Sequence, residues 1–196
     1  MTKLCSFIAA ACRLPDALAR CRKGVAAVEF AFIAPVMIVL FFGVIEGSAA
    51  LSASRKTLLA STTLADLVAQ ETEVKKSDLD DLFTGAKSII SDGTVNASFT
   101  IMSVVLDKNT DQLKVNWSYR SDGAQPYAAG SVYTGSIDKT LLDDTSSLIV
   151  AKTDYQYSSP ISQHIIGAVT IDKVSTHWPR RTARVKYCVT AGNCTS

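Results

Sequence analysis

The chain has few of the side chains and motifs with which enzymes usually carry out chemistry. It contains only two histidines, His164 and His177, and their spacing is not that of a pair of metal ligands. The Cys-x-x-Cys motif, the Gly-x-Ser-x-Gly elbow, the phosphate-binding glycine loop and the dinucleotide glycine pattern are all missing. A triad of scattered serine, histidine and aspartate side chains stays open from sequence alone. We expect no enzyme, no metal site and no cofactor.

Acidic residues are scarce in one part of the chain. Residues 1–24 contain five basic residues and one acidic residue, whereas the remainder contains fifteen basic and seventeen acidic residues. The net charge of +2 over the whole chain argues against a nucleic-acid partner. A basic block ahead of an apolar run predicts that the N-terminus stays in the cytoplasm and that the rest of the chain lies outside.

Cysteine is also sparse, and the five cysteines divide between the two ends of the chain. Cys5, Cys12 and Cys21 precede the apolar run, whereas Cys188 and Cys194 lie near the C-terminus. With the topology above, the first three stay reduced and the last two lie in an oxidising compartment. Five residues separate the last two, and Gly192-Asn193 suits a tight reversal. We therefore predict a disulfide between Cys188 and Cys194.

A long apolar run is the strongest feature that is present. Between Val25 and Leu51 only Glu29 and Glu46 are charged, and Pro35 interrupts the run. The length suffices for a membrane-spanning helix, which needs about 20 residues. Proline within the run is compatible with a membrane helix. We predict a transmembrane segment over residues 25–51.

The apolar run has three interpretations. A secretory signal peptide fits the charged flank and the small residues near Ser52, but the basic region is long and Glu29 opens the apolar stretch. A plain signal anchor explains Glu29 no better. The third interpretation is cleavage after Gly24, which gives Val25 a free cationic amine that Glu29 can pair with, on the same chain or a neighbour.

The segment "RKGVAAVEFAFIAPVMIVLFFGVIEGS" resembles a known family of membrane proteins. Basic residues, a glycine, four small apolar residues and Glu-Phe are similar to the class III processing site of type IV pilins. With Pro35 and Glu46, the longer pattern resembles the TadE/TadG-like pseudopilins of the tight-adherence (Flp) pilus system. The later stretches "VAKTDYQYSSPIS" and "THWPRRTARVKYC" are similar to the late strands of that family.

The resemblance implies a role for particular residues and partners. It makes Gly24 the residue before the cut, Val25 the mature N-terminus and Glu29 the assembly glutamate. The implied partners are a prepilin peptidase, other pilins and pseudopilins, the pilus assembly platform and inner-membrane lipid. Longer relatives carry an adhesion-like domain with a metal-binding Asp-x-Ser-x-Ser motif, and "DDTSS" at 143–147 has the wrong spacing for it. The short TadE-like type is therefore the expected match.

Two helices are expected before any strand. Residues 51–74 continue the first helix, with Leu51, Leu58 and Ala65 seven apart and with Leu64, Leu67 and Val68 beside them on one apolar stripe. Ser77 with Asp80 predicts a capping box that begins a second helix. Its apolar face is expected to contain Leu79, Leu82, Phe83, Ala86, Ile89 and Ile90.

The pattern then changes to alternation, which predicts strands. In 113–120, Leu113, Val115, Trp117 and Tyr119 alternate with polar residues and predict one buried strand face. The stretch "NASFTIMSVVLD" forms a hairpin with it through "DKNTD". Residues 121–147 are expected to be a long loop with one short helix. The stretches "SLIVAKTDYQY", "GAVTIDKV" and "ARVKYC" supply up to three more strands.

These elements predict an α+β, pilin-like fold, in which the outer half of the first helix covers an antiparallel sheet. The expected parts are a cleaved cytoplasmic leader over 1–24, a transmembrane segment over 25–51, a helical region over 52–92 and a sheet region over 93–196. We expect a minor pseudopilin in the bacterial inner membrane, single-pass, with a periplasmic C-terminal domain that can enter the pilus. The alternative is a signal-anchored or secreted globular domain with a binding or catalytic role. The partner of Arg180 and Arg181 stays open.

Overall fold

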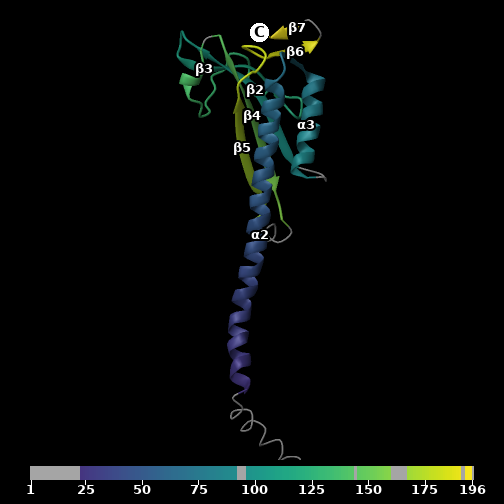
Figure 1. The fold of residues 1–196 in the computed structure, drawn as a ribbon, viewed down its shortest axis with the longest axis vertical. Helices are drawn as coiled ribbons and strands as arrows, with labels where there is room; N and C mark the ends of the chain where they lie inside the picture. The colour runs from purple at the N-terminus through teal and green to yellow at the C-terminus, as the bar shows by residue number, and fades with distance from the viewer. Residues whose placement is uncertain (1–22, 92–95, 144, 160–166, 191–192, 196) are drawn as a thin grey trace, which may run out of the picture. The chain divides into compact units, whose positions relative to one another are not determined.

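The computed structural model describes residues 23–91, 96–143, 145–159, 167–190 and 193–195. Residues 1–22 of the predicted leader, with Cys5, Cys12 and Cys21, lie outside these residues, and so does His164. The chain divides into two units, residues 1–48 and 49–196. The fold is α+β, as predicted, with a long N-terminal helix, a second helix and two sheets (Figure 1).

Helix α2 extends from Lys23 to Ala69 and is one continuous helix with Pro35 inside it. It ends five residues before the predicted position, because the backbone N–H groups of Gln70 and Glu71 bond to the carbonyls of Leu67 and Val68, both at 3.2 Å. These two hydrogen bonds join residues three apart, as in a 3₁₀ helix. They tighten the last turn and satisfy two of the carbonyls that lack a partner at the end of a helix.

The buried stripe of α2 in the second unit agrees only in part with the predicted one. Leu64, Ala65 and Val68 are buried as predicted, but Leu51, Leu58 and Leu67 are exposed. The helix buries a stripe of mostly small residues: Ala53, Thr57, Ala60, Ser61, Leu64, Ala65, Val68 and Ala69. Ser61 Oγ donates a hydrogen bond of 2.8 Å to the carbonyl of Ala151 in the sheet. A helix that approaches a strand this closely has room only for small side chains, so the bulky leucines face outward.

The main sheet has four antiparallel strands in the order β3-β2-β4-β5. The strands are β2 (Ala97–Asp107), β3 (Gln112–Arg120), β4 (Ser147–Tyr157) and β5 (Val169–His177). The predicted β2–β3 hairpin is confirmed, with Asp107 opposite Gln112. Strands β4 and β5 correspond to the predicted stretches that begin at Ser147 and Gly167.

The expectation of one buried face on β3 is wrong. The β2–β3 register pairs Ser103 with Trp117 but Val104 with Val115, so Asn116 is an extra residue in β3. A bulge of one residue reverses the alternation beyond it. Trp117 therefore joins the core on one face of the sheet, whereas Val115 joins a second core on the other.

Each face of the main sheet is covered. Helices α2 and α3 pack over one face, where the largest core contains the phenyl ring of Phe83 stacked at 6.0 Å from both Phe99 and Tyr119. The predicted long loop covers the other face with Tyr127, Tyr133, Ile137 and Leu142, and it contains the short 3₁₀ helix η1, Lys139–Leu141. The burial of β2 on both sides follows from these two layers.

Helix α3, Lys76–Ile90, confirms the predicted second helix but begins differently. The predicted pair Ser77 and Asp80 does not cap it. Asp78 Oδ2 instead accepts from the backbone N–H of Lys75 at 3.1 Å, and Asp80 accepts from the hydroxyl of Tyr119 at 2.9 Å. Since Asp78 is the third residue of the helix, its carboxylate plays the acidic part of a capping box.

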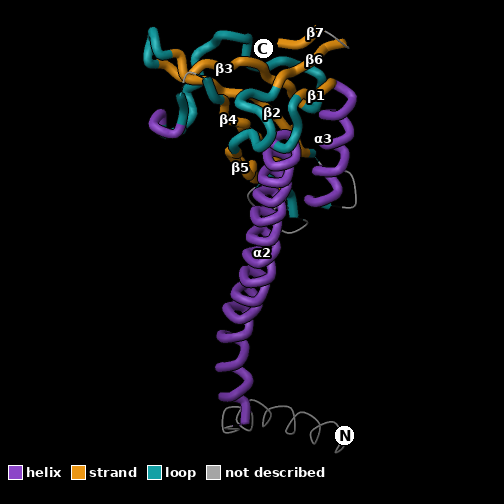
Figure 2. The backbone as a smooth tube through the Cα atoms, turned by 45° about the horizontal axis from the view of Figure 1, so that its top comes forward, coloured by secondary structure: helices purple, strands orange, loops and turns teal. Residues whose placement is uncertain are grey.

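A second, small sheet has the order β1-β6-β7, with strands Glu73–Lys75, Lys186–Thr190 and Asn193–Thr195 (Figure 2). Strand β1 pairs with β6 in parallel, which places Val74 opposite Tyr187. The predicted single meandering sheet is therefore wrong in this part. Strand β1 has only three residues inside a polar stretch, so alternation cannot reveal it.

Candidate functional site: the N-terminal segment of α2 and the contacts of the second unit

The residues predicted for processing and assembly lie on the exposed first part of α2. The helix begins at Lys23, next to the predicted cleavage position at Gly24. Val25 is 56% exposed, and Glu29 is exposed as well. A Cβ placed on Gly24 would meet no atom within 4 Å among the described residues. This part of the chain therefore presents both residues to a partner and buries neither within itself.

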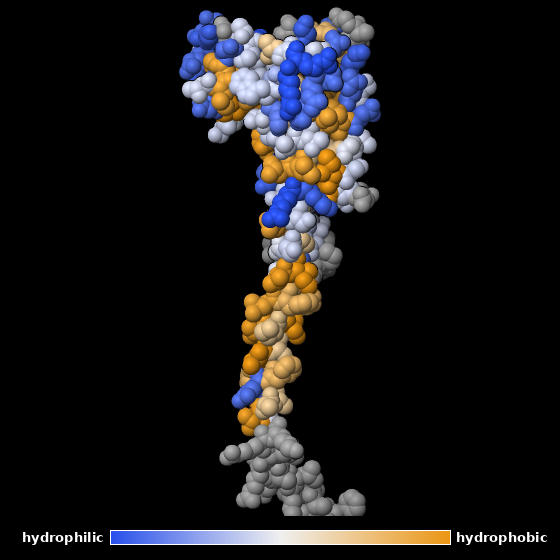
Figure 3. All heavy atoms as spheres, in the orientation of Figure 1, coloured by the Kyte–Doolittle hydropathy of each residue, from blue (hydrophilic) through white to orange (hydrophobic). Residues whose placement is uncertain are grey.

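The apolar side chains that follow are also exposed. They include Phe30, Phe32, Ile33, Val36, Met37, Ile38, Val39, Leu40, Phe41 and Phe42, and Figure 3 shows this part of the helix as mostly hydrophobic. The helix is long and apolar enough to cross a membrane, and none of its most apolar window is buried in the chain. Exposure of so many large apolar groups is costly in water and favourable in lipid.

Pro35 lies inside this segment, as its sequence position implies, and the helix continues through it. Glu46, the second charged residue of the segment, is half-buried, unlike Glu29. The two glutamates are seventeen residues apart on one helix, so the structure does not bring them together. Each is a separate feature at one end of the apolar segment.

The predicted disulfide is present in the small sheet of the second unit. Cys188 of β6 and Cys194 of β7 are directly opposite each other, with Cα atoms 4.0 Å apart. Glu73 of β1 lies beside the bridge, and the three side chains are close enough together to resemble a metal site. Since both sulfur atoms are in the disulfide, neither is available as a thiolate ligand. The cluster is therefore structural.

Sequence reasoning missed the role of Asp66 on α2. Its carboxylate accepts from the Arg180 guanidinium and from the amide of Gln70 at 2.9 Å, and His177 Nδ1 lies 3.8 Å away. The backbone N–H of Arg180 also donates to the carbonyl of Ala69 at 2.8 Å. Arg180 thus fastens the chain after β5 to the C-terminal end of α2, whereas Arg181 is exposed. No local motif signals this contact, since 114 residues separate the partners.

Tyr119 connects β3 to α3 through its hydrogen bond to Asp80. Burial and, next, the hydrogen bond to Asp80 raise the pKa of Tyr119 to about 12. The ring stacks against Tyr187 of β6 with centroids 5.8 Å apart. Nearby, the indole Nε1–H of Trp117 donates to the carbonyl of Val185 at 2.8 Å. These contacts hold the small sheet to the main sheet and to α3.

An open hollow of about 340 Å³ lies between α3 and the turn after β3. Lys76, Lys87, Asp80 and Asp122 line it, but Asp80 is bonded to Tyr119 and Asp122 to Arg120. Asp122 has its pKa lowered to about 2 by the hydrogen bond from Arg120. Both carboxylates thus accept hydrogen bonds from other side chains of the second unit.

The segment that carries the exposed residues is also the segment that matches a family. The model of the family described as TadE-like protein matches residues 24–66. The match begins at the predicted cleavage position and covers the apolar helix together with most of its continuation in the second unit, and it is consistent with a TadE-like protein. No curated protein matches the chain, and no solved structure matches it.

Proposed function

From the premise that residues 24–66 have the pattern of a TadE-like protein, we propose that this chain is a minor pseudopilin-like component of a Tad (Flp) pilus assembly system. It acts by assembly and not by catalysis. A prepilin peptidase removes the leader after Gly24, and the mature chain begins at Val25. The observation that carries this proposal is the exposed apolar helix with Glu29 at its start.

Glu29 supports assembly because an acid is costly at that position without a partner. A charged residue at the centre of a membrane helix costs about 2.5–3.5 kcal/mol on insertion scales, and one nearer the interface, such as Glu29, costs less. The new amine of Val25 is four residues away, about one helical turn. Its charge offsets that of Glu29, within one chain or between a chain and its neighbour. Pairing between chains would also fix the axial position of one subunit against the next.

The proposed partners follow from this arrangement. The apolar segment lies in the bacterial inner membrane, with the basic leader in the cytoplasm and residues 52–196 in the periplasm. Other pilins or pseudopilins and the assembly platform contact the mature helix. The disulfide between Cys188 and Cys194 supports this orientation, because structural disulfides persist in oxidising compartments.

The alternative, a signal peptide cut near Ser52, is less consistent with the fold. Helix α2 continues without a break through Ser52 to Ala69, and Ala53 and Thr57 are already buried in the second unit. A cut at that position would fall within a helix and next to core residues. Gly24 lies in the first turn of the helix, ahead of the apolar segment and away from these core residues, which favours cleavage there over a cut near Ser52.

The test is the N-terminal sequence of the mature protein, isolated from membranes of cells that contain or lack the prepilin peptidase. A start at Val25 only in the presence of the peptidase is the expected result. A start near Ser52 in both strains would replace the proposal with the secreted domain. An uncut chain in both strains would replace it with a plain membrane anchor.

A further inference from the structure

An apolar groove lies between α2 and α3 in the second unit. It has a volume of about 240 Å³, and Thr63, Leu64 and Leu67 line it from α2. From α3 the lining residues are Asp81, Leu82, Gly85, Ala86 and Ile89. Figure 3 shows hydrophobic side chains on the outer face over these helices. Leu67 remains 39% exposed, so the groove is open to a partner.

The rim of the groove carries an acid that pairs with no described residue. Asp81 is exposed and makes none of the ion pairs or hydrogen bonds found in the described part of the chain. Its neighbours on α3 are occupied, since Asp78 caps the helix and Asp80 binds Tyr119. Asp81 thus marks one end of an apolar groove with a negative charge.

The same chain presents a complementary ridge on α2. Leu59 is 57% exposed, and Lys56 lies one turn before it, also exposed and without a partner among the described residues. Leu59, Thr63 and Leu67 follow one another at intervals of four residues, so the ridge leads toward the groove along one side of the helix. The ridge has a base and a leucine, and the groove has an acid and an apolar floor.

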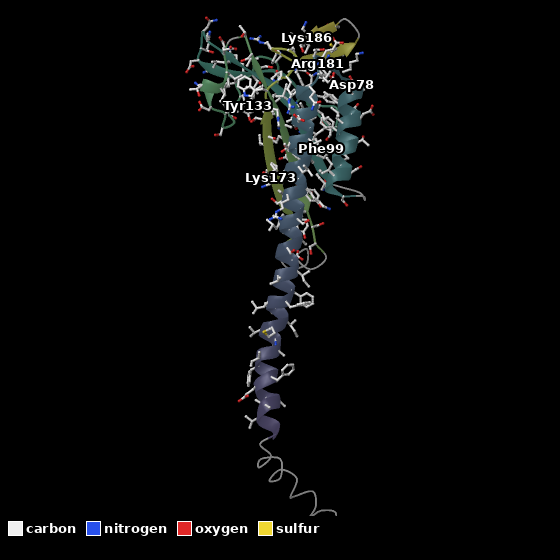
Figure 4. The ribbon with its side chains drawn as sticks, viewed as in Figure 1. Asp78, Phe99, Tyr133, Lys173, Arg181 and Lys186 are labelled. Carbon is white, nitrogen blue, oxygen red and sulfur yellow. A yellow bond between two sulfur atoms is a disulfide. The ribbon has the colours of Figure 1, made fainter. Side chains whose placement is uncertain are left out.

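Lys56 on α2 and Asp81 on α3 lie at different positions along the axis of α2. Helix α3 begins beside the small sheet, where Asp78 and Lys186 are labelled in Figure 4, and it runs back along α2. Asp81 is in its second turn and lines the groove with Leu67, which lies eleven residues beyond Lys56. Eleven helical residues extend about 16 Å, farther than a lysine side chain reaches. Within one chain the base and the acid are therefore separated.

We propose that the groove receives α2 of a second copy of this chain, displaced along the helix so that its Leu59 enters beside Leu67 and Leu82. The eight residues from Leu59 to Leu67 correspond to a displacement of about 12 Å. Lys56 of the second copy then lies at the level of Leu64, about one turn before Leu67 and within reach of Asp81. This inference rests on the proposed function, because it requires copies that stand parallel and move past one another axially.

The displacement distinguishes assembled chains from chains that merely share a membrane. Two parallel copies at the same depth place Lys56 beside Lys56, which is repulsive. Only a copy that has moved along its axis brings Lys56 to Asp81. The contact uses different surfaces on the two copies, so it is heterologous: one copy contributes the ridge and the other the groove.

The test is disulfide cross-linking between two differently tagged full-length chains, made together in cells that contain the assembly system. One chain carries Leu59→Cys and the other Leu82→Cys, each with Cys5, Cys12 and Cys21 replaced by serine. We expect a mixed cross-linked dimer that carries both tags. The matched control replaces Leu59→Cys with Leu58→Cys. Leu58 is 46% exposed, and the period of the helix places it on the side of α2 opposite Thr63, Leu64 and Leu67. We expect at least a fivefold lower yield.

Charge exchange provides the second measurement. Lys56→Glu in the first chain or Asp81→Lys in the second should each reduce the cross-link at least threefold, and the two together should restore it. Equal yields from Leu58→Cys and Leu59→Cys, no cross-link, or no restoration would each overturn the groove contact. The N-terminal sequence of the same samples keeps the questions separate: a start at Val25 without the cross-link rejects the groove contact alone, whereas the cross-link in chains not cut at Gly24 rejects the proposed processing alone.

Discussion

The hydroxyl of Tyr119 on β3 donates a hydrogen bond of 2.9 Å to the carboxylate of Asp80 on α3. The contact joins residues 39 positions apart, and it lies beside the stacked rings of Phe83 and Tyr119. It therefore holds the second helix at a fixed position against the sheet, which in turn fixes one wall of the groove between α2 and α3.

Replacement of Tyr119 by phenylalanine should destabilise the protein by about 1 kcal/mol at pH 7, the usual net value of one buried hydrogen bond. The folded pKa of Tyr119 is raised to about 12 from the ordinary 10.0. A raised pKa means that its stabilising effect is complete below pH 10 and is lost as the pH rises toward 12. The free-energy difference between the wild type and the variant should therefore shrink over that window.

Denaturant unfolding of the detergent-solubilised protein at pH 7, 10, 11 and 12 measures this change. Tyr127→Phe is the control, because it leaves the Asp80 contact intact and should keep the wild-type slope between pH 10 and 12. A difference between wild type and Tyr119→Phe that grows with pH would contradict the assignment.

Replacement of Phe83 by alanine should cost about 3–5 kcal/mol of unfolding free energy, as expected for a large side chain removed from a packed core. Its ring is 2% exposed and stacks against two other rings. Leu59→Ala removes an apolar side chain that is mostly exposed and should change the stability by less than about 0.5 kcal/mol. Similar losses from both variants, measured by the same denaturant unfolding, would contradict the described packing.

Gly24→Leu should leave the precursor uncut, about 24 residues heavier than the mature chain. The reason is that a peptidase must bring the backbone before the cut close to its catalytic groups, which glycine allows. Immunoblotting of cell membranes shows the size. Gly43→Leu, on the same helix and with no atom within 4 Å of the added Cβ, should mature normally. Maturation of Gly24→Leu at the normal size would show that the cut lies elsewhere.

Glu29→Leu should be processed and inserted as well as the wild type, or better, since a charge has been removed from the apolar segment. Pilus assembly should fail, because the contact with the mature amine is lost. Glu29→Gln keeps the shape without the charge and should fail equally. Electron microscopy of the cells together with immunoblotting separates assembly from insertion. Normal piliation with either variant would remove the assembly role of Glu29.

The disulfide predicts the thiol chemistry of the mature chain. Alkylation under denaturing conditions should modify no cysteine before reduction and two cysteines after it, because the other three lie in the leader. Loss of the bridge in Cys188→Ser/Cys194→Ser should cost about 2 kcal/mol, since the loop is short. Two reactive thiols in the unreduced mature chain would contradict both the bridge and the periplasmic placement of the C-terminus.

Local patterns predicted most helices and strands correctly. The long apolar helix, the second helix, the β2–β3 hairpin and the disulfide each depend on residues close together in the sequence. The roles of Glu29 and Gly24 stay predictions, and they too depend on a local pattern. Such signals need no knowledge of distant contacts.

The misses arise where distant residues decide the structure. The outward position of Leu58 and Leu67 follows from the close approach of α2 to β4, which periodicity alone does not reveal. The bulge at Asn116 reverses the faces of β3 within a strand whose alternation is regular. The contact between Asp66 and Arg180 joins α2 to the segment after β5, 114 residues away. Each depends on packing that overrides the local pattern.

The parallel pairing of β1 with β6 has a consequence for the order of folding. Val74 finds its strand partner Tyr187 only after more than a hundred further residues have been made, and the indole N–H of Trp117 waits for Val185 as its acceptor. Contacts so distant in sequence form slowly, because a long loop must close first. We expect a chain that stops before residue 185 to leave Val74 without its strand partner and Trp117 without its acceptor, so that β6 completes the core of the second unit last.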